Sequence, residues 1–173
     1  FYDLPGGAAA GATDSKMPDM QAGWEQMCSN VMAGLSGVNM VYEAAGMHAS
    51  LLGFCHESLI LGDDIIGQAL RCVRGVEVND ETMALDQIAE VCMGGPGHYL
   101  GTDQTLARMQ TDCVYPTFGN RMSPKEWAEK DKPDLIENAI ARKEEILSHR
   151  SKAQFDPALD AAIRERFNIY LPA

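Results

Sequence analysis

Two short apolar segments that flank a single helix constrain this chain more than any other feature. Residues 38–42 are apolar and partly β-branched, which predicts a strand, and residues 5–12 are small, which suits a tight loop or a buried strand. Between them, apolar residues recur at helical spacing from Trp24 to Leu35, and Gly37 follows where glycine commonly ends a helix. With both segments taken as strands, this is a βαβ unit, which requires a parallel pair.

After this unit the sequence predicts helices almost alone. Residues 44–54 suit a loop or a short helix. The segment from Ser123 to Glu126 is a capping box with proline at the first helical position, the strongest single local signal in the chain. The expected helices cover about 57–73, 80–93 after a cap at Asn79, 103–110, 123 onward, 133–148 and 156 onward.

The number of strands limits the fold class. Two strands do not make a stable sheet by themselves, so the pair must dock on strands supplied elsewhere. A (β/α)8 barrel usually takes about 250 residues, so this chain of 173 could hold only its last strands and closing helices. We therefore expect a helix-rich α/β fold, the C-terminal part of a (β/α)8 TIM-type barrel that is incomplete in this chain. Phe1, which is not an initiator methionine, suggests that the chain begins inside a larger architecture.

We expect residues 1–173 to form a single domain. Within it, the barrel strands, loops and helices would occupy about 1–122, and the C-terminal helices about 123–173. No apolar run reaches the roughly 20 residues that a membrane helix requires, and no signal segment opens the chain. We therefore expect a cytoplasmic protein without a membrane partner.

The charge balance bears on the partners. The formal net charge is −11, from 14 basic and 25 acidic residues. This argues against nucleic acid, which recruits proteins through lysine and arginine contacts to phosphate. It is compatible with a cationic small substrate or a basic protein surface, and equally with an acidic surface that serves solubility alone.

The five cysteines predict neither disulfides nor a zinc site. Their number is odd, and no two lie within four residues of each other. We expect buried free thiols in a reducing compartment. His48, Cys55 and His56 supply at most three ligands at a spacing that matches no zinc pattern, so we expect no bound metal and interpret the histidines as partly buried packing residues.

Two loops are candidates for the functional site. In parallel α/β folds, reactive groups lie on the loops that follow the strands, here residues 11–16 and 42–47. Asp14 and Glu43 with Tyr42 suit a quaternary or tertiary ammonium, by charge and by cation–π contact. For Asp14 the alternative is a helix N-cap or a pair with Lys16, and for Glu43 it is a solvated loop carboxylate.

Several motifs resemble one enzyme family. The run from Asp14 to Gly23, Asp-Ser-Lys-Met-Pro-Asp-Met-Gln-Ala-Gly, is specific, and Tyr42 to Met47 and Gly97 to Gly101 match further along the chain. The chain closely resembles the C-terminal portion of the trimethylamine methyltransferase family, over essentially its whole length. The resemblance implies a (β/α)8 barrel that transfers a methyl group from a small methylated amine to the Co(I) corrinoid (cobalamin) of a separate carrier protein. We also expect a homo-oligomer, although no residue pattern specifies the oligomeric state.

One residue departs from the family pattern. In the trimethylamine enzymes of methanogens, pyrrolysine stands two residues before the aspartate that matches Asp14, and here that place is Ala12. The resemblance is therefore to pyrrolysine-free members, which act on quaternary amines such as glycine betaine. It places Ala12 and Asp14 at the catalytic positions. The substrate-binding residues that it implies are Thr13, Lys16, Gln21, Tyr42, Glu43 and Met47.

Two other interpretations stay open. The chain could be a non-catalytic fragment or interaction module of such an enzyme, in which case the natural protein would have a mass near 18.8 kDa. It could also be a helical scaffold without a ligand, although the polar loops at 12–19 and 43–48 would then have no common task.

Overall fold

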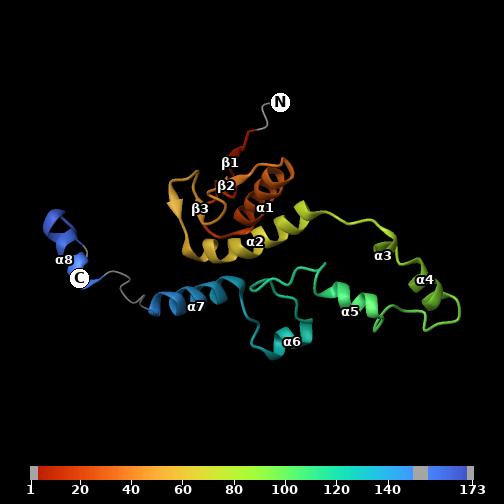
Figure 1. The fold of residues 1–173 in the computed structure, drawn as a ribbon. Helices are drawn as coiled ribbons and strands as arrows, with labels where there is room; N and C mark the ends of the chain where they lie inside the picture. Colours follow the sequence, from red (N-terminus) through yellow and green to blue (C-terminus); the bar gives the residue numbers. More distant parts are fainter. Residues whose placement is uncertain (1–3, 150–155, 171–173) are drawn as a thin grey trace. The chain divides into compact units, whose positions relative to one another are not determined.

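A computed structural model describes residues 4–149 and 156–170. The described chain is helix-rich, with a few short strands near its beginning (Figure 1). Its elements are β1 (Gly7–Ala9), α1 (Met20–Leu35), β2 (Met40–Tyr42), β3 (Met47–His48), β4 (Gly53–Phe54), α2 (His56–Arg74), α3 (Asp80–Met83), α4 (Leu85–Cys92), α5 (Asp103–Met109), α6 (Pro124–Glu129), α7 (Leu135–Ser148) and α8 (Pro157–Arg166). The chain divides into two compact units, Phe1–Lys143 and Glu144–Ala173.

The predicted βαβ unit is confirmed. β1 and β2 pair in parallel, with Ala8 opposite Val41, so the small segment near the start of the chain is a strand. α1 begins at Asp19, whose side chain accepts a hydrogen bond from the backbone of Ala22. It ends before Gly37, whose φ of 77° is the left-handed conformation that glycine adopts without strain.

The segment expected as a loop or short helix is instead a small antiparallel hairpin. β3 and β4 pair, with Met47 opposite Phe54. The connecting turn places Ala49, Ser50 and Leu51 in succession at positive φ, between 50° and 71°. The sequence carries no glycine or asparagine at these three positions, so the usual turn signal for this conformation is absent.

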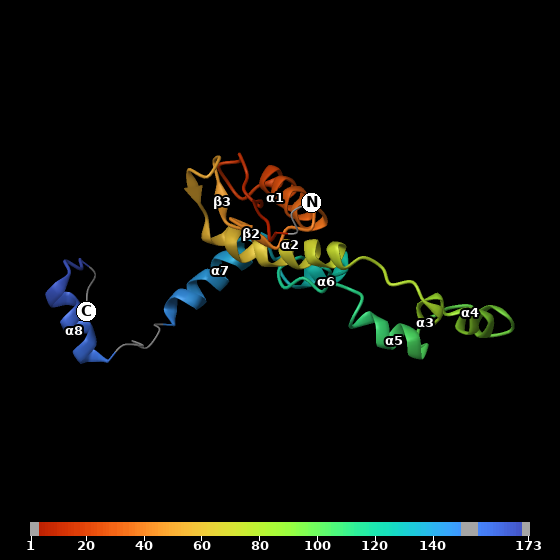
Figure 2. The same cartoon turned by 45° about the horizontal axis from the view of Figure 1, so that its top comes forward.

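α1 and α2 pack against each other and form the centre of the first unit (Figure 2). Gly34 allows this approach, since a Cβ there would lie 2.5 Å from Cγ2 of Val73. Gly62 of α2 likewise leaves room for the loop after β2, since a Cβ there would lie 2.3 Å from Cβ of Ala45. The buried apolar residues are correspondingly small, and none of the described large side chains is fully buried.

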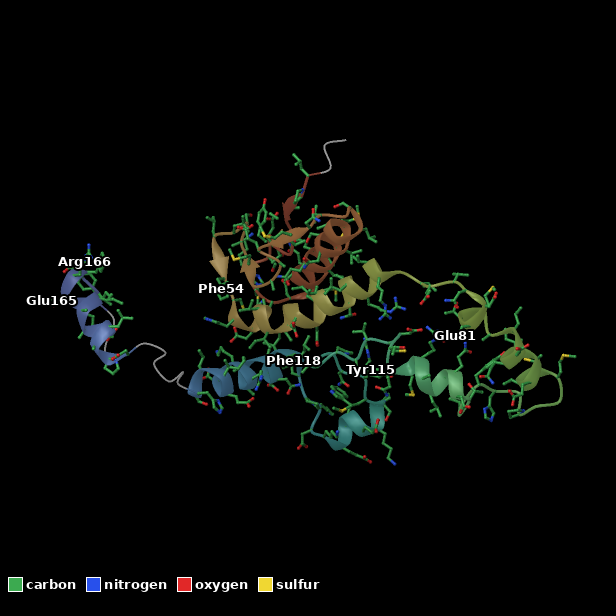
Figure 3. All side chains as sticks on the ribbon, viewed as in Figure 1. Phe54, Glu81, Tyr115, Phe118, Glu165 and Arg166 are labelled. Carbon is green, nitrogen blue, oxygen red and sulfur yellow. The ribbon has the colours of Figure 1, made fainter. Side chains whose placement is uncertain are left out.

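The later helices form largely where the sequence predicts them. The cap at Asn79 and the capping box at Ser123 are both present. The expected single helix over 80–93 is two helices, α3 and α4, because Ala84 adopts a left-handed φ of 51°. Glu81 of α3 pairs with Arg108 of α5, with Oε1 and Nη2 2.7 Å apart; Figure 3 labels Glu81.

The predicted helix-rich character of the chain is confirmed. The described strands form two separate two-stranded sheets, and residues 4–149 and 156–170 contain no closed barrel. All five cysteines are free, as expected, but the prediction that they are buried is wrong: Cys55 is half-buried and the other four are exposed. None of the described helices has the length and apolar character needed to span a membrane.

Candidate functional site

The loop that follows β1 lies directly beside the loop that follows β2. Gly11 has a φ of 81°, and a Cβ there would lie 2.1 Å from the carbonyl oxygen of Ala44. The backbone N–H of Gly11 donates to the hydroxyl of Ser29 at 2.9 Å, and the amide of Asn30 donates to the same Ala44 carbonyl at 3.0 Å. Two polar residues of α1 therefore fix how the two loops meet, and glycine is required at position 11.

Glu25 of α1 holds the loop after β1 in place. Its Oε2 accepts hydrogen bonds from Thr13 Oγ1 at 2.6 Å and from the backbone N–H of Asp14 at 2.9 Å, and its Oε1 accepts from Gln21 Nε2 at 2.9 Å. The bond from Thr13, followed by the one from Gln21, lowers the pKa of the Glu25 carboxyl below its ordinary value. An ionised Glu25 therefore fixes the backbone from which Asp14 projects.

The β3–β4 hairpin holds the same loop from the other side. The backbone of Thr13 bonds to the backbone of Met47 and of Ser50, at 3.1 and 3.2 Å. The hydroxyl of Ser50 donates to Oδ1 of Asp14 at 2.6 Å. Asp14 is exposed, and the Ser50 hydroxyl orients its carboxylate. Asp14 is not the N-cap of α1, which is Asp19. Lys16 contacts Asp14 through the backbone and not through the carboxylate, since its Nζ donates to the Asp14 backbone oxygen at 2.8 Å.

His48 is a buried structural histidine. Its Nδ1 lies 3.2 Å from the backbone oxygen of Ser15, and its Nε2 lies 2.7 Å from the hydroxyl of Ser58 in α2. A proton on Nδ1 would satisfy both contacts, with Ser58 donating to Nε2. Among the described residues no group of three or more histidine, cysteine, aspartate or glutamate side chains could hold a metal.

The residues expected in the pocket divide into two groups. Thr13 is buried, Ala12 and Met47 are half-buried, and the Gln21 amide is bonded to Glu25, so these residues build the loop. Asp14, Lys16, Tyr42 and Glu43 are exposed. Because β1 and β2 are parallel and in register, both loops emerge at the same edge of the pair.

Tyr42 and Glu43 have distinct local geometries at the end of β2. A Cβ on Gly7 would lie 3.3 Å from Cε1 of Tyr42, so the tyrosine ring lies over a strand residue without a side chain. Glu43 has a φ of 65°, a conformation that costs free energy in a residue other than glycine.

Sequence reasoning missed Glu25, Ser29, Asn30 and Ser50. With Gln26, the first three are the polar positions in the middle of α1, and polar residues among apolar ones are a signal that could have found them. Ser50 carries no such signal, because its position depends on a turn that the sequence does not predict.

Comparison with known proteins places the chain in one family. The family model described as trimethylamine methyltransferase (MTTB) matches residues 1–169. The chain belongs to the trimethylamine methyltransferase family. Within it, the chain is similar to the glycine betaine methyltransferase of Desulfitobacterium hafniense (strain Y51), with 33% identity over 95% of this chain and 34% of that protein. It is also similar to the trimethylamine methyltransferase MttB of Methanosarcina barkeri (strain Fusaro / DSM 804), with 31% identity over 90% of this chain and 31% of that protein. The chain thus spans about a third of the length of these relatives.

Proposed function

We propose that the full-length protein is a corrinoid-dependent methyltransferase that moves a methyl group from a quaternary amine such as glycine betaine to the Co(I) of a carrier protein. Ala12 carries this proposal, because no pyrrolysine is available at that position to bind a tertiary amine covalently. The relative from D. hafniense, named a glycine betaine methyltransferase, supports the same substrate class. The carrier's corrinoid would supply the Co(I) nucleophile that accepts the methyl group.

The task left to this chain is to bind and orient a cation. A quaternary ammonium loses its methyl group with a neutral tertiary amine as leaving group, so the protein need not move a proton at the reacting nitrogen. Proximity and electrostatic complementarity are then the main contributions. In our proposal Asp14 and Glu43 favour the positive charge and Tyr42 offers its ring face. Lys16 contacts the carboxylate of the betaine.

Two exposed leucines lie at the edge of this site. Leu51 and Leu52, at the tip of the β3–β4 hairpin, are exposed and lie next to Ser50, which contacts Asp14. We propose that these leucines border the opening through which the carrier's corrinoid approaches. We further propose that the parallel pair belongs to a (β/α)8 barrel in a single domain over 1–173 and the preceding sequence, in a cytoplasmic homo-oligomer.

The direct test is demethylation by the full-length protein with cob(I)alamin, followed by the absorbance of methylcobalamin. Glycine betaine, proline betaine and carnitine are compared with trimethylamine. We expect product from at least one quaternary amine and none from trimethylamine. Absence of product from every quaternary amine would refute the substrate class, and a mature natural protein near 18.8 kDa would favour the interaction module instead.

Substitution of Asp14 tests the residue assignment. Asp14→Asn keeps a hydrogen-bond acceptor for Ser50 but removes the charge, so we expect KM for the quaternary amine to rise about tenfold, which corresponds to ~1.4 kcal/mol of binding. Asp63→Asn, at an exposed site on α2, is the matched control and should leave KM unchanged. An unchanged KM in Asp14→Asn would show that the Asp14 charge does not bind the cation.

A further inference from the structure

Three successive residues of the β3–β4 hairpin contact the loop that carries Asp14. His48 Nδ1 lies 3.2 Å from the backbone oxygen of Ser15, and the backbone N–H of Ala49 donates to the same oxygen at 2.9 Å. The hydroxyl of Ser50 donates to the Asp14 carboxylate at 2.6 Å. The conformation of the hairpin therefore decides how the Asp14 carboxylate is oriented.

The turn that supplies these contacts is strained. Ala49, Ser50 and Leu51 lie in succession at positive φ, between 50° and 71°. Each such conformation costs free energy in a residue other than glycine, and it persists only where the surrounding structure holds it. A contact from outside the turn is therefore needed to keep Ser50 against Asp14.

His48 makes such a contact, because its ring also reaches α2. Nε2 lies 2.7 Å from the hydroxyl of Ser58, and both residues are only 3% exposed. A buried hydrogen bond is costly to lose, since a polar group left without its partner there is also without water. α2 packs against α1, so the bond to Ser58 fastens the strained turn to the centre of the first unit.

Both ring nitrogens of His48 are engaged, which fixes the orientation of the ring. With the proton on Nδ1, the ring donates to the Ser15 oxygen and accepts from the Ser58 hydroxyl. A phenylalanine ring could fill the same space but could bond to neither. The pattern of contacts therefore favours an anchor over a residue that only fills the core.

We propose that His48, anchored on Ser58, is a positioning residue for the ammonium site: it holds the strained turn so that Ser50 orients the Asp14 carboxylate. The identity of the ligand rests on the proposed function, whereas the anchor does not depend on it. The charge of a quaternary ammonium is complete before methyl transfer and absent from the leaving amine. Poor orientation of Asp14 should therefore raise KM more than it lowers kcat.

Three substitutions isolate the anchor. Ser58→Ala removes the hydroxyl on α2. His48→Asn places an amide near the position of Nδ1, so it keeps a donor for Ser15 and loses the contact with Ser58; His48→Gln places the amide near Nε2 and keeps that contact. Ser36→Ala is the control, because it removes another serine hydrogen bond of 2.7 Å, at the end of α1.

Hydrogen exchange in the full-length protein shows whether the anchor holds the turn, with no substrate present. The reporters are the backbone N–H groups of Ala49 and Ser50, which donate to backbone oxygens of the loop after β1. We expect exchange to be about tenfold faster in Ser58→Ala and His48→Asn, and within about threefold of wild type in His48→Gln and Ser36→Ala. Unchanged exchange in Ser58→Ala, or an equal acceleration throughout α1, would overturn the proposal.

Kinetics of the same variants show whether the anchor positions Asp14. For a quaternary amine that the wild type demethylates, we expect KM to rise about fivefold in Ser58→Ala and His48→Asn, with kcat within about twofold. His48→Gln and Ser36→Ala should keep a KM near that of the wild type. Faster exchange with an unchanged KM would refute the positioning role. If no quaternary amine reacts, the proposed function fails, and the exchange rates alone decide whether His48 holds the turn.

Discussion

At the scale of single residues, the candidate site depends on side chains that hold its loop in place. Glu25 accepts from Thr13, Gln21 and the backbone of Asp14, and Ser50 orients the Asp14 carboxylate. The family motif thus contains residues of two kinds: those that build the loop and those that the loop presents. Mutations of the first kind should act through the position of Asp14, whose own environment they change.

Backbone strain at Ala49, in the turn before β4, should lower the stability of the protein. Ala49 has a φ of 50°, where glycine is tolerated without steric cost, so Ala49→Gly should stabilise the protein by up to about 1 kcal/mol. Ala107 lies in the exposed middle of α5, where the same substitution should cost about 1 kcal/mol. Urea unfolding measures both. Destabilisation by both substitutions would contradict a strained turn at Ala49.

At the scale of elements, a single carboxylate fastens a loop to α2. Asp64 accepts hydrogen bonds from the backbone N–H groups of Thr117, Phe118 and Gly119, at 2.7, 2.7 and 3.0 Å. A Cβ on Gly119 would lie 2.9 Å from Cγ of Pro116, so the loop leaves little room for a side chain at this position. The loop after α5 is therefore held by one side chain through its backbone.

Removal of that side chain should release the loop without unfolding α2. Asp64→Ala leaves three backbone donors without their acceptor, and we expect a loss of about 1–3 kcal/mol. Hydrogen exchange at Thr117 to Gly119 should accelerate, while exchange in α1 stays unchanged. Asp63→Ala, at the exposed neighbouring position, is the control. Equal exchange at the loop in both variants would show that Asp64 does not hold it.

A salt bridge between α2 and α7 should make the stability of the protein depend on pH. Lys143 Nζ lies 2.8 Å from Glu57 Oε1, with only 21% and 19% of the two side chains exposed. The hydrogen bond from Lys143 is the main cause that lowers the pKa of Glu57 from 4.5 to about 2. Since the folded pKa lies below the unfolded one, this stability is present above about pH 4.5 and is lost as the pH falls toward 2.

Replacement of the lysine isolates this contribution. In Lys143→Met the pKa of Glu57 should rise toward its ordinary value, so the free energy of unfolding should fall less steeply between pH 4.5 and 3 than in the wild type. Lys125→Met is the control, because Lys125 pairs with Glu129 on the surface at 3.8 Å with both side chains well exposed. Identical pH slopes for wild type and Lys143→Met would refute the assignment.

At the scale of the whole molecule, the described residues leave many large apolar side chains exposed. The exposed residues include Met40 and Tyr42 on β2, Leu52 and Phe54 on the hairpin, and Met20, Trp24, Met32 and Leu35 on α1. Exposed apolar area of this extent normally indicates an interface. We therefore predict that residues 1–173 expressed alone bind the dye ANS and self-associate with rising concentration, by light scattering. The full-length protein should bind ANS far more weakly; equal binding would contradict the prediction.

The sequence alone determined the local elements and the family. The helix caps at Asn79 and Ser123, the glycine after α1 and the strand–helix–strand order follow from the neighbours of each residue, and the motif from Asp14 to Gly23 indicated the family. These features depend on residues close together in the chain, so a linear pattern records them.

Tertiary structure decided what depends on distant contacts. The left-handed turn at 49–51, the break at Ala84 and the exposure of four cysteines have no local signal. Glu25 and Ser50 meet at Asp14 although 25 positions of sequence separate them, because the hairpin and α1 enclose the same loop. Local propensity fixes which segments form helices and strands, whereas packing of α1, α2 and the hairpin determines which side chains surround Asp14.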